Sequence, residues 1–146
     1  MTAPAEWLHH LEDEADAAYL YRILADLEPE ARRSQIYRQL AGVEDRHVTL
    51  WKQLLTDQGH SLPAHRPTAR AKLLAFLARR FGPTFLAPML LREEGREVKG
   101  YLDLHRESPD SPAGETALTL ARESAQHAES LAGMIGGAGE PWHQAG

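Results

Sequence analysis

Cysteine is absent from the 146 residues of this chain. Its absence excludes disulfides, thiolate-bound metals, iron–sulfur clusters and a cysteine-rich electron-transfer centre. A metal ion would therefore be held by oxygen ligands and by some of the eight histidines.

Long apolar runs are also missing. A membrane-spanning helix needs about 18 or more apolar residues, and the best candidate, residues 73–91, is broken by two arginines, a glycine and two prolines. The N-terminus lacks the basic and then apolar segments of a signal peptide. A formal charge of -5 argues against nucleic acid as a partner. We expect a soluble chain that forms one domain and buries a core.

The first half of the chain is expected to form two long helices. Over residues 5–27, apolar residues recur at spacings near three and four, which indicates an amphipathic helix. Pro29 suits the first turn of a second helix, which Gly59 would end. The short link between the two helices makes them antiparallel.

The second half is expected to form a short helix and then two further long ones. Thr68 and Gly82 are plausible ends for a short helix over residues 69–81. The long helices are expected over residues 83–107 and 113–135, separated by Ser-Pro-Asp-Ser-Pro and ended by two glycines. The fold class is therefore all-α, a ferritin-like four-helix bundle with a long crossover that contains the short helix between the second and third long helices.

The first and third long helices share a pattern. Each carries a glutamate seven residues before a tyrosine, Glu14 before Tyr21 and Glu94 before Tyr101. Positions seven apart on a helix return to within about 20° of each other, so each phenol could orient a nearby carboxylate by a hydrogen bond. Glu97, one turn after Glu94, is a further candidate ligand or could bridge to an extra ion.

The second and fourth long helices each carry a glutamate and a histidine on one face, Glu44 with His47 and Glu123 with His127. With the two glutamates of the first and third helices, these residues form the ligand set of a di-iron four-helix bundle. A buried carboxylate is very costly unless it is paired, and metal coordination removes that cost. The set suits two iron ions, with manganese or zinc as possible substitutes.

One position departs from a perfect repeat. Three residues before His127 stands Ser124, where the second helix has its glutamate. Our preferred interpretation is that Glu123, four residues before the histidine, ligates the metal. The alternative is that Ser124 leaves one ligand position empty and Glu123 contacts His47.

The remaining aromatic, histidine and acidic residues have ordinary expected roles. Five aromatic side chains are expected to pack in the interior: Trp7, Trp51, Phe76, Phe81 and Phe85. Five histidines are expected to be solvated: His9, His10, His60, His65 and His105. One acidic cluster is expected to form a wet helix face, or otherwise a second, surface iron site: Glu12, Asp13 and Asp16.

Two segments resemble the rubrerythrin-like, ferritin-like domain at the N-terminus of certain membrane iron transporters of the vacuolar iron transporter family: EADAAYLYRILADLEPE and LAGVEDRHVTLWKQLL. Its third helix is similar to RRFGPTFLAPMLLREEGREVKGYL, and the sequence before its first membrane span is similar to GAGEPWHQAG. The resemblance covers essentially the whole chain. Ser124 departs from it, because the family pattern has a glutamate there.

The resemblance implies a ferritin-like domain over residues 1–135 and a linker over residues 136–146 that leads to a membrane domain of the full-length chain. The domain would lie at the cytoplasmic face of the membrane, bind Fe(II), govern its delivery and form a homodimer. The metal ligands that the resemblance implies are Glu14, Glu44, His47, Glu94, Glu123 and His127.

Three functions are open at this point. The first is an iron-binding domain of a membrane transporter that captures or senses Fe(II). The second is an enzyme, a ferroxidase or peroxidase that acts on Fe(II) with O₂ or peroxide, although the lack of cysteine counts against a self-contained rubrerythrin-type peroxidase. The third is a helical interaction module whose buried carboxylates pair with Arg22, Arg46 or Lys99.

Overall fold

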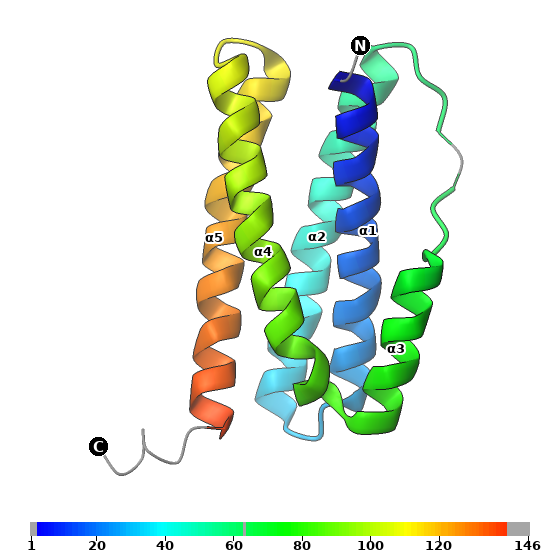
Figure 1. Ribbon diagram of the computed structural model, residues 1–146, viewed down its shortest axis with the longest axis vertical. Coiled ribbons are helices and arrows are strands. Elements are labelled where there is room, and N and C mark those ends of the chain that lie inside the picture. The colour runs from blue at the N-terminus through cyan, green and yellow to red at the C-terminus, as the bar shows by residue number, and fades with distance from the viewer. Residues whose placement is uncertain (1–2, 63, 140–146) are drawn as a thin grey trace. The chain divides into compact units, whose positions relative to one another are not determined.

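The chain is all-α, as the sequence predicts. The computed structural model describes residues 3–62 and 64–139, and every regular element in that part of the chain is an α-helix (Figure 1). None of the helices among these residues has the length and apolar character needed to cross a membrane. The five helices are α1 Ala3–Leu27, α2 Ala31–Asp57, α3 Ala69–Phe81, α4 Pro83–Glu107 and α5 Pro112–Gly139.

The helices fall into two compact units. The N-terminal unit, Met1–Pro83, holds α1, α2 and α3, and the C-terminal unit, Thr84–Gly146, holds α5 and all but the first residue of α4. Each unit has its own buried apolar side chains.

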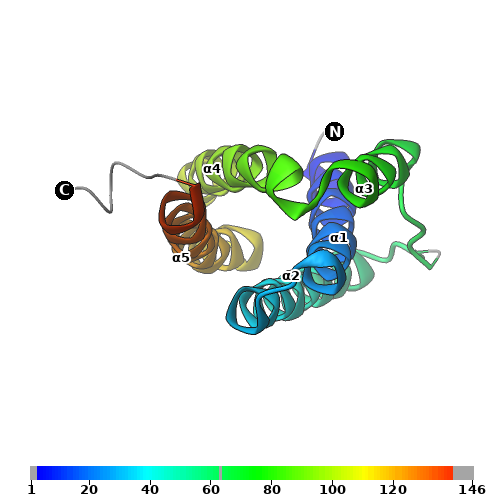
Figure 2. The same cartoon turned by 90° about the horizontal axis from the view of Figure 1, so that it is seen from below.

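In the N-terminal unit α1 and α2 form an antiparallel pair, and they lie side by side in two views (Figures 1 and 2). The link between them is short, and Glu30 caps the start of α2: its carboxylate accepts a hydrogen bond from Arg33 N at 2.7 Å. Ser34 Oγ then donates to Ala25 O at 2.7 Å and ties the first turn of α2 to the last turn of α1. The helix thus begins two residues after Pro29. Pro29 precedes the helix and does not lie in its first turn, where the sequence suggested it.

The interface of this pair is built from leucines and aromatic rings, which lie on the same buried helix faces as Glu14, Glu44 and His47. Its fully or almost fully buried members include Leu11, Leu20, Leu24, Leu40, Trp51 and Leu55. Tyr21 stacks on Tyr37 across the pair, with ring centroids 6.5 Å apart. Burial of such side chains is the main stabilising contribution to a helix pair.

α3 has the bounds that the sequence predicts. Thr68 Oγ1 accepts a hydrogen bond from Ala71 N at 3.1 Å, and Gly82 ends the helix with a positive φ of 97°. The helix packs on α1 through a face of small residues, Ala71, Ala75 and Ala78, which are all fully buried. Small side chains let the two helix backbones approach closely, so the larger side chains of α3 point away from α1.

This geometry overturns part of the expected packing of aromatic residues. Trp7 and Trp51 are buried as predicted, but Phe76, Phe81 and Phe85 are 60%, 59% and 51% exposed. The prediction was wrong for all three. For Phe76 and Phe81 the reason is that α3 buries its alanine face, and not its phenylalanine face; Phe85 lies on an exposed face of α4. The Arg80 guanidinium covers part of the Phe81 ring, 5.4 Å from its centroid.

Asp16 corrects the expectation of a wet acidic face on α1. Its side chain is buried, because its carboxylate accepts hydrogen bonds from Thr68 Oγ1 at 2.7 Å and from Thr68 N at 3.2 Å. His65 Nε2 lies 3.2 Å from the same carboxylate. Asp16 therefore joins α1 to the start of α3, while Glu12 and Asp13 are exposed as expected.

The C-terminal unit is a second helix pair, with α4 and α5 side by side (Figures 1 and 2). The predicted break is found at residues 108–111, where Ser111 Oγ accepts from Gly114 N at 2.9 Å and donates to Ser108 O at 2.8 Å. His105 Nδ1 donates to Gly114 O at 2.9 Å, so this histidine is half-buried and not solvated as predicted.

α5 continues to Gly139, four residues beyond its predicted end. Gly136 and Gly137 were expected to stop the helix, and that prediction was wrong. A glycine in a helix costs only about 1 kcal/mol relative to alanine and does not by itself end it. The first four residues of the segment expected to be a linker are thus helical, and residues 140–146 lie outside the described residues.

Candidate metal centre

The N-terminal unit brings three of the predicted ligands together. Glu14 comes from α1, and Glu44 and His47 come from α2; each offers one potential ligand atom, and these atoms all lie within 4.8 Å of one another. All three side chains are fully buried. His47 Nδ1 contacts Glu14 Oε2 across the helix pair. We call these three residues the N-terminal cluster.

The periodicity of the two helices explains this convergence. Glu44 and His47 lie in the same stripe of α2 as three core residues, at spacings of four and three. Glu14 lies in the corresponding stripe of α1. A polar residue in such a stripe enters the interior together with its apolar neighbours, because the whole face of the helix is buried. The stripe of α2 consists of Leu40, Glu44, His47, Trp51 and Leu55.

The charge of the N-terminal cluster makes it fit a cation. It contains two carboxylates and one imidazole, so a protonated His47 would still leave one net negative charge in a buried place. A divalent ion would neutralise this charge and use the oxygen and nitrogen atoms as ligands. The donor set, oxygen-rich with one imidazole, is of the kind that binds iron, manganese or zinc.

The C-terminal unit repeats the contact between a glutamate and a histidine. Glu94 on α4 is 2% exposed and His127 on α5 is 6% exposed, and His127 Nδ1 lies 3.8 Å from Glu94 Oε2. We call these two residues the C-terminal pair. Tyr21 and Tyr101, each two turns after the glutamate of its own helix, are both fully buried. The repeat in the sequence thus corresponds to a repeat in the structure of the two units.

The other two predicted ligands differ from these in their surroundings. Glu97 and Glu123 are only half-buried, and neither belongs to a group of potential metal ligands among the described residues. Ser124, by contrast, is fully buried, and its Oγ atom has no hydrogen-bond partner among the described residues. It shares the buried face of α5 with His127, whereas Glu123 lies at the edge of that face. Ligation by Glu123 therefore stays a prediction.

His10 is a neighbour of the N-terminal cluster, and the expectation that it is solvated was wrong. Its ring stacks on Trp51 of α2, with centroids 5.2 Å apart and planes 15° apart. Burial lowers the pKa of His10 below its ordinary value of 6.5, the Glu14 carboxylate opposes this by raising it, and His9 lowers it further. His10 falls on the polar face that the sequence predicts for α1, so the helical pattern did not predict this stacking.

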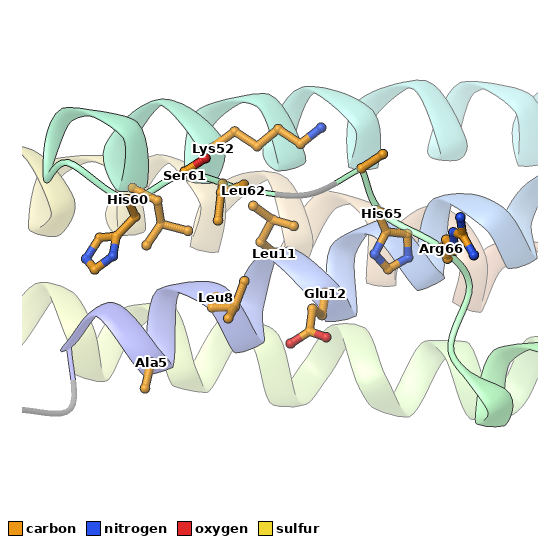
Figure 3. Close-up of a pocket in the computed structure, with 12 residues that line it drawn as sticks. Ala5, Leu8, Leu11, Glu12, Lys52, His60, Ser61, Leu62, His65 and Arg66 are labelled. Carbon is orange, nitrogen blue, oxygen red and sulfur yellow. The ribbon is translucent and has the colours of Figure 1, made fainter.

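A separate cavity opens in the N-terminal unit between the start of α1, the end of α2 and the loop that follows α2 (Figure 3). Its volume is about 450 Å³, and four leucines line it, Leu8, Leu11, Leu55 and Leu62, beside charged side chains such as Lys52. None of the residues of the N-terminal cluster lines it. No sequence pattern predicts this cavity, because its wall depends on the path of an irregular loop.

One observation bears on the third hypothesis, an interaction module whose buried carboxylates pair with basic side chains and not with a metal. Arg22 pairs with Asp45 at the surface, where both side chains are half exposed, and not with a buried carboxylate. Exposed pairs of this kind contribute little to stability. The hypothesis that Arg22 pairs with a buried carboxylate is therefore wrong.

Comparison of the chain with protein-family models, with curated proteins and with solved structures finds no match.

Proposed function

We propose that this chain is an iron-binding domain that captures or senses Fe(II) with buried glutamates and histidines. The observation that carries the proposal is the N-terminal cluster, Glu14, Glu44 and His47, in which two carboxylates and an imidazole are fully buried within 4.8 Å of one another. Evolution rarely retains such a charge in a core unless it is compensated or has a function.

The ferritin-like bundle is part of the same proposal. Each unit supplies an antiparallel helix pair with a buried glutamate–histidine contact, and the pairs are joined by a segment long enough to contain α3. Four long helices that carry such residues are typical of di-iron carboxylate proteins. In this proposal the N-terminal cluster and the C-terminal pair supply the ligands of two metal ions.

The residues have distinct roles in binding. The carboxylates and imidazoles would ligate the ions, and the phenols of Tyr21 and Tyr101 would orient the carboxylates on their own helices. Iron, when bound, supplies the ability to exchange electrons with oxygen species. The apolar residues around the cluster exclude water and so hold the ligands in one arrangement.

The proposed context is a membrane iron transporter. The sequence resemblance to the ferritin-like domain of that family supports a role in governing the delivery of Fe(II) to a membrane domain of the same full-length chain. By the same resemblance, the domain would lie at the cytoplasmic face and form a homodimer.

Binding of metal is the first test. Under anaerobic conditions, calorimetric titration with Fe(II) is expected to show saturable binding to the wild type and its loss in Glu14→Ala and His47→Ala. Glu12→Ala is the matched control, since Glu12 lies on the same helix as Glu14 but is exposed. Equal binding by the wild type and both cluster variants would refute the proposal.

A ferroxidase is the second candidate, and the paired carboxylates of the N-terminal cluster favour it, since oxygen-rich iron sites are the ones that react with O₂. Stopped-flow absorbance after mixing Fe(II)-loaded protein with O₂ would distinguish the two functions. A fast oxidation phase that Glu44→Gln abolishes would indicate an enzyme, whereas oxidation no faster than that of free Fe(II) would indicate binding alone.

A further inference from the structure

The side of α3 that faces away from α1 carries apolar and basic side chains together. Leu73 and Phe76 are 57% and 60% exposed, and Arg80, one turn further along the helix, is exposed as well. Spacings of three and four residues put these three side chains in one stripe, opposite the buried alanines that pack on α1. Lys72 and Arg79 flank the stripe and are also exposed. We call these five residues the outer face of α3, and α3 lies beside α1 in both views of the N-terminal unit (Figures 1 and 2).

The outer face lies in the most basic stretch of the chain. Residues 58–92 contain six of the sixteen lysines and arginines and none of the 21 aspartates and glutamates. Within the part of the chain that the structure describes, no carboxylate pairs with Lys72, Arg79 or Arg80. Arg80 lies over the Phe81 ring instead. A chain with a formal charge of -5 thus has a positive surface on α3, which attracts an anionic partner.

The apolar residues of α3 are distributed against the stability of the isolated fold. The helix buries its smallest apolar side chains, the alanines, and leaves Leu73 and Phe76 in water. Burial of a leucine or phenylalanine stabilises a fold far more than burial of an alanine, because more apolar area leaves water. Packing within the chain therefore does not account for the large apolar residues, whereas a partner that covers them does.

An anionic lipid bilayer supplies both contacts at one surface. Its headgroup phosphates bind lysine and arginine, and the upper part of its acyl chains accepts phenylalanine and leucine. The long stems of lysine and arginine let their charged ends reach the phosphates from a helix that lies among apolar groups. A helix with basic and apolar residues on its exposed side is typical of such a contact.

Other anionic partners fit this face less well. The centre of a protein interface is depleted of charged residues, but Arg80 lies in the same stripe as Leu73 and Phe76. Nucleic acid would bind the arginines through its phosphates and would leave Leu73 without an apolar contact.

The fold holds the helix ready for this contact. A helix of 13 residues is marginal by itself in water. Here Thr68 caps its start, Gly82 ends it, and its alanines pack on α1. Binding therefore does not carry the cost of ordering the helix, which presents a face about 20 Å long at about 1.5 Å per residue.

We propose that the outer face of α3 docks on an anionic lipid bilayer. Leu73 and Phe76 enter the boundary between headgroups and acyl chains, and the basic side chains bind the headgroup phosphates. The helix lies parallel to the membrane plane, so the contact orients the N-terminal unit on the bilayer. Neither iron nor the N-terminal cluster takes part, and a link to a membrane domain does not by itself bring α3 to the lipid. Failure of this contact and failure of the proposed function are therefore distinguishable.

Co-sedimentation of the metal-free protein with lipid vesicles measures the contact. The wild type should bind vesicles of phosphatidylcholine mixed with phosphatidylserine, much less those of phosphatidylcholine alone, and less as salt screens the charges. The double variant Arg79→Gln with Arg80→Gln should lower the partition coefficient about fivefold for each charge removed. Phe76→Ser should lower it about tenfold through the lost apolar contact.

The matched control is the double variant Arg32→Gln with Lys99→Gln. It removes the same charge from exposed positions on α2 and α4, and the partition coefficient should change less than about threefold. Thermal melting followed by circular dichroism checks the folding of Phe76→Ser. The arginine variant keeps the test valid if that protein is unfolded, because it alters only exposed positions.

The absence of cysteine allows a label at one chosen position. Phe76→Cys, labelled with nitrobenzoxadiazole, should shift its emission to the blue on the anionic vesicles as the dye leaves water. Gln39→Cys, at an exposed position on α2, should show no shift.

Three results would each overturn the docking: no binding to the anionic vesicles, equal binding to both kinds of vesicle, or an equal loss in the control variant. Sedimentation equilibrium without lipid tests the other occupant of this face. A dimer that Phe76→Ser dissociates would assign the outer face to a second copy of the chain and would also overturn the docking on lipid.

Discussion

His47 on α2 contacts Glu14 on α1 through its Nδ1 atom, with both side chains fully buried. This contact joins the two helices at the level where Glu44 also enters the interior. The same arrangement that would bind a cation thus destabilises the metal-free folded state, because two carboxylates close together repel each other in a medium of low dielectric constant.

Glu44→Gln should therefore separate stability from binding. We expect the metal-free variant to be as stable as the wild type or up to about 2 kcal/mol more stable, because one buried charge is removed and the shape is kept. With Fe(II) or Mn(II) at 100 times the dissociation constant, the wild type should gain about 2.7 kcal/mol, and the variant should gain much less. Urea unfolding with and without a chelator measures both quantities.

The matched control is Glu12→Gln, which alters an exposed glutamate of α1 and should leave both the metal-free stability and the metal-dependent gain unchanged. A large loss of stability in metal-free Glu44→Gln would mean that the carboxylate has a structural partner, and it would remove the argument for a cation.

The ends of α3 and the break between the last two long helices could be predicted from the sequence, because both depend on local chemistry. Thr68 and Gly82 set the bounds of α3 where their types indicate, and α4 and α5 are separated by residues 108–111 of the Ser-Pro-Asp-Ser-Pro segment. The meeting of Glu14 with Glu44 and His47 follows from helical periodicity and a short connection. A period of 3.6 residues fixes which side chains share a face.

What could not be predicted depends on which face packs against which neighbour. Phe76 lies among the apolar residues of an amphipathic helix and yet is exposed, because α3 packs its alanines against α1. Asp16 lies in an acidic segment and yet is buried, because its partners Thr68 and His65 are about 50 residues away in the sequence. Neither outcome has a signal in local composition, since each requires the path of the loop between α2 and α3.

Asp16→Ala should loosen the attachment of α3. The carboxylate accepts two hydrogen bonds from Thr68 and contacts His65, so its removal leaves the part-buried Thr68 N–H without this partner. We expect a loss of about 2–3 kcal/mol in the free energy of unfolding. Limited proteolysis should also cut faster between α2 and α3. Asp13→Ala is the control, because Asp13 pairs at the surface with His9 at 3.3 Å and should change the stability by less than about 0.5 kcal/mol.

His10 should make the metal-free fold less stable in mild acid. Its pKa in the folded protein lies below 6.5, chiefly through burial against Trp51, while Glu14 opposes and His9 adds to the lowering. Above pH 6.5 the imidazole is neutral in both the folded and unfolded chains. As the pH falls below 6.5, the unfolded chain takes up the proton first, so the stability decreases until the pH passes the folded pKa.

His10→Gln, which cannot be charged, should lose this part of the pH dependence. The difference in unfolding free energy between wild type and variant is expected to be constant above pH 6.5 and to change in favour of the variant below it. Urea unfolding with a chelator between pH 5 and pH 8 measures it, with His60→Gln at an exposed position as the control. Parallel curves for wild type and His10→Gln would show that His10 is not the group responsible.

Gly114 in the first turn of α5 is expected to tolerate no side chain. A Cβ atom added there would lie 1.7 Å from Ser108 O and 2.7 Å from Ser108 C, both backbone atoms that cannot turn aside. Gly114→Ala should therefore displace the connection between α4 and α5, break the hydrogen bond from His105 to Gly114 O, and lower the unfolding free energy by more than about 1 kcal/mol.

Gly133→Ala is the matched control, because Gly133 lies in the same helix and has nothing within 4 Å of an added Cβ. Since alanine is the better helix former, that variant should gain about 0.5–1 kcal/mol in the free energy of unfolding, so the two substitutions should move the midpoint of urea unfolding in opposite directions. A higher free energy of unfolding in both variants would mean that residue 114 is not in close contact with Ser108.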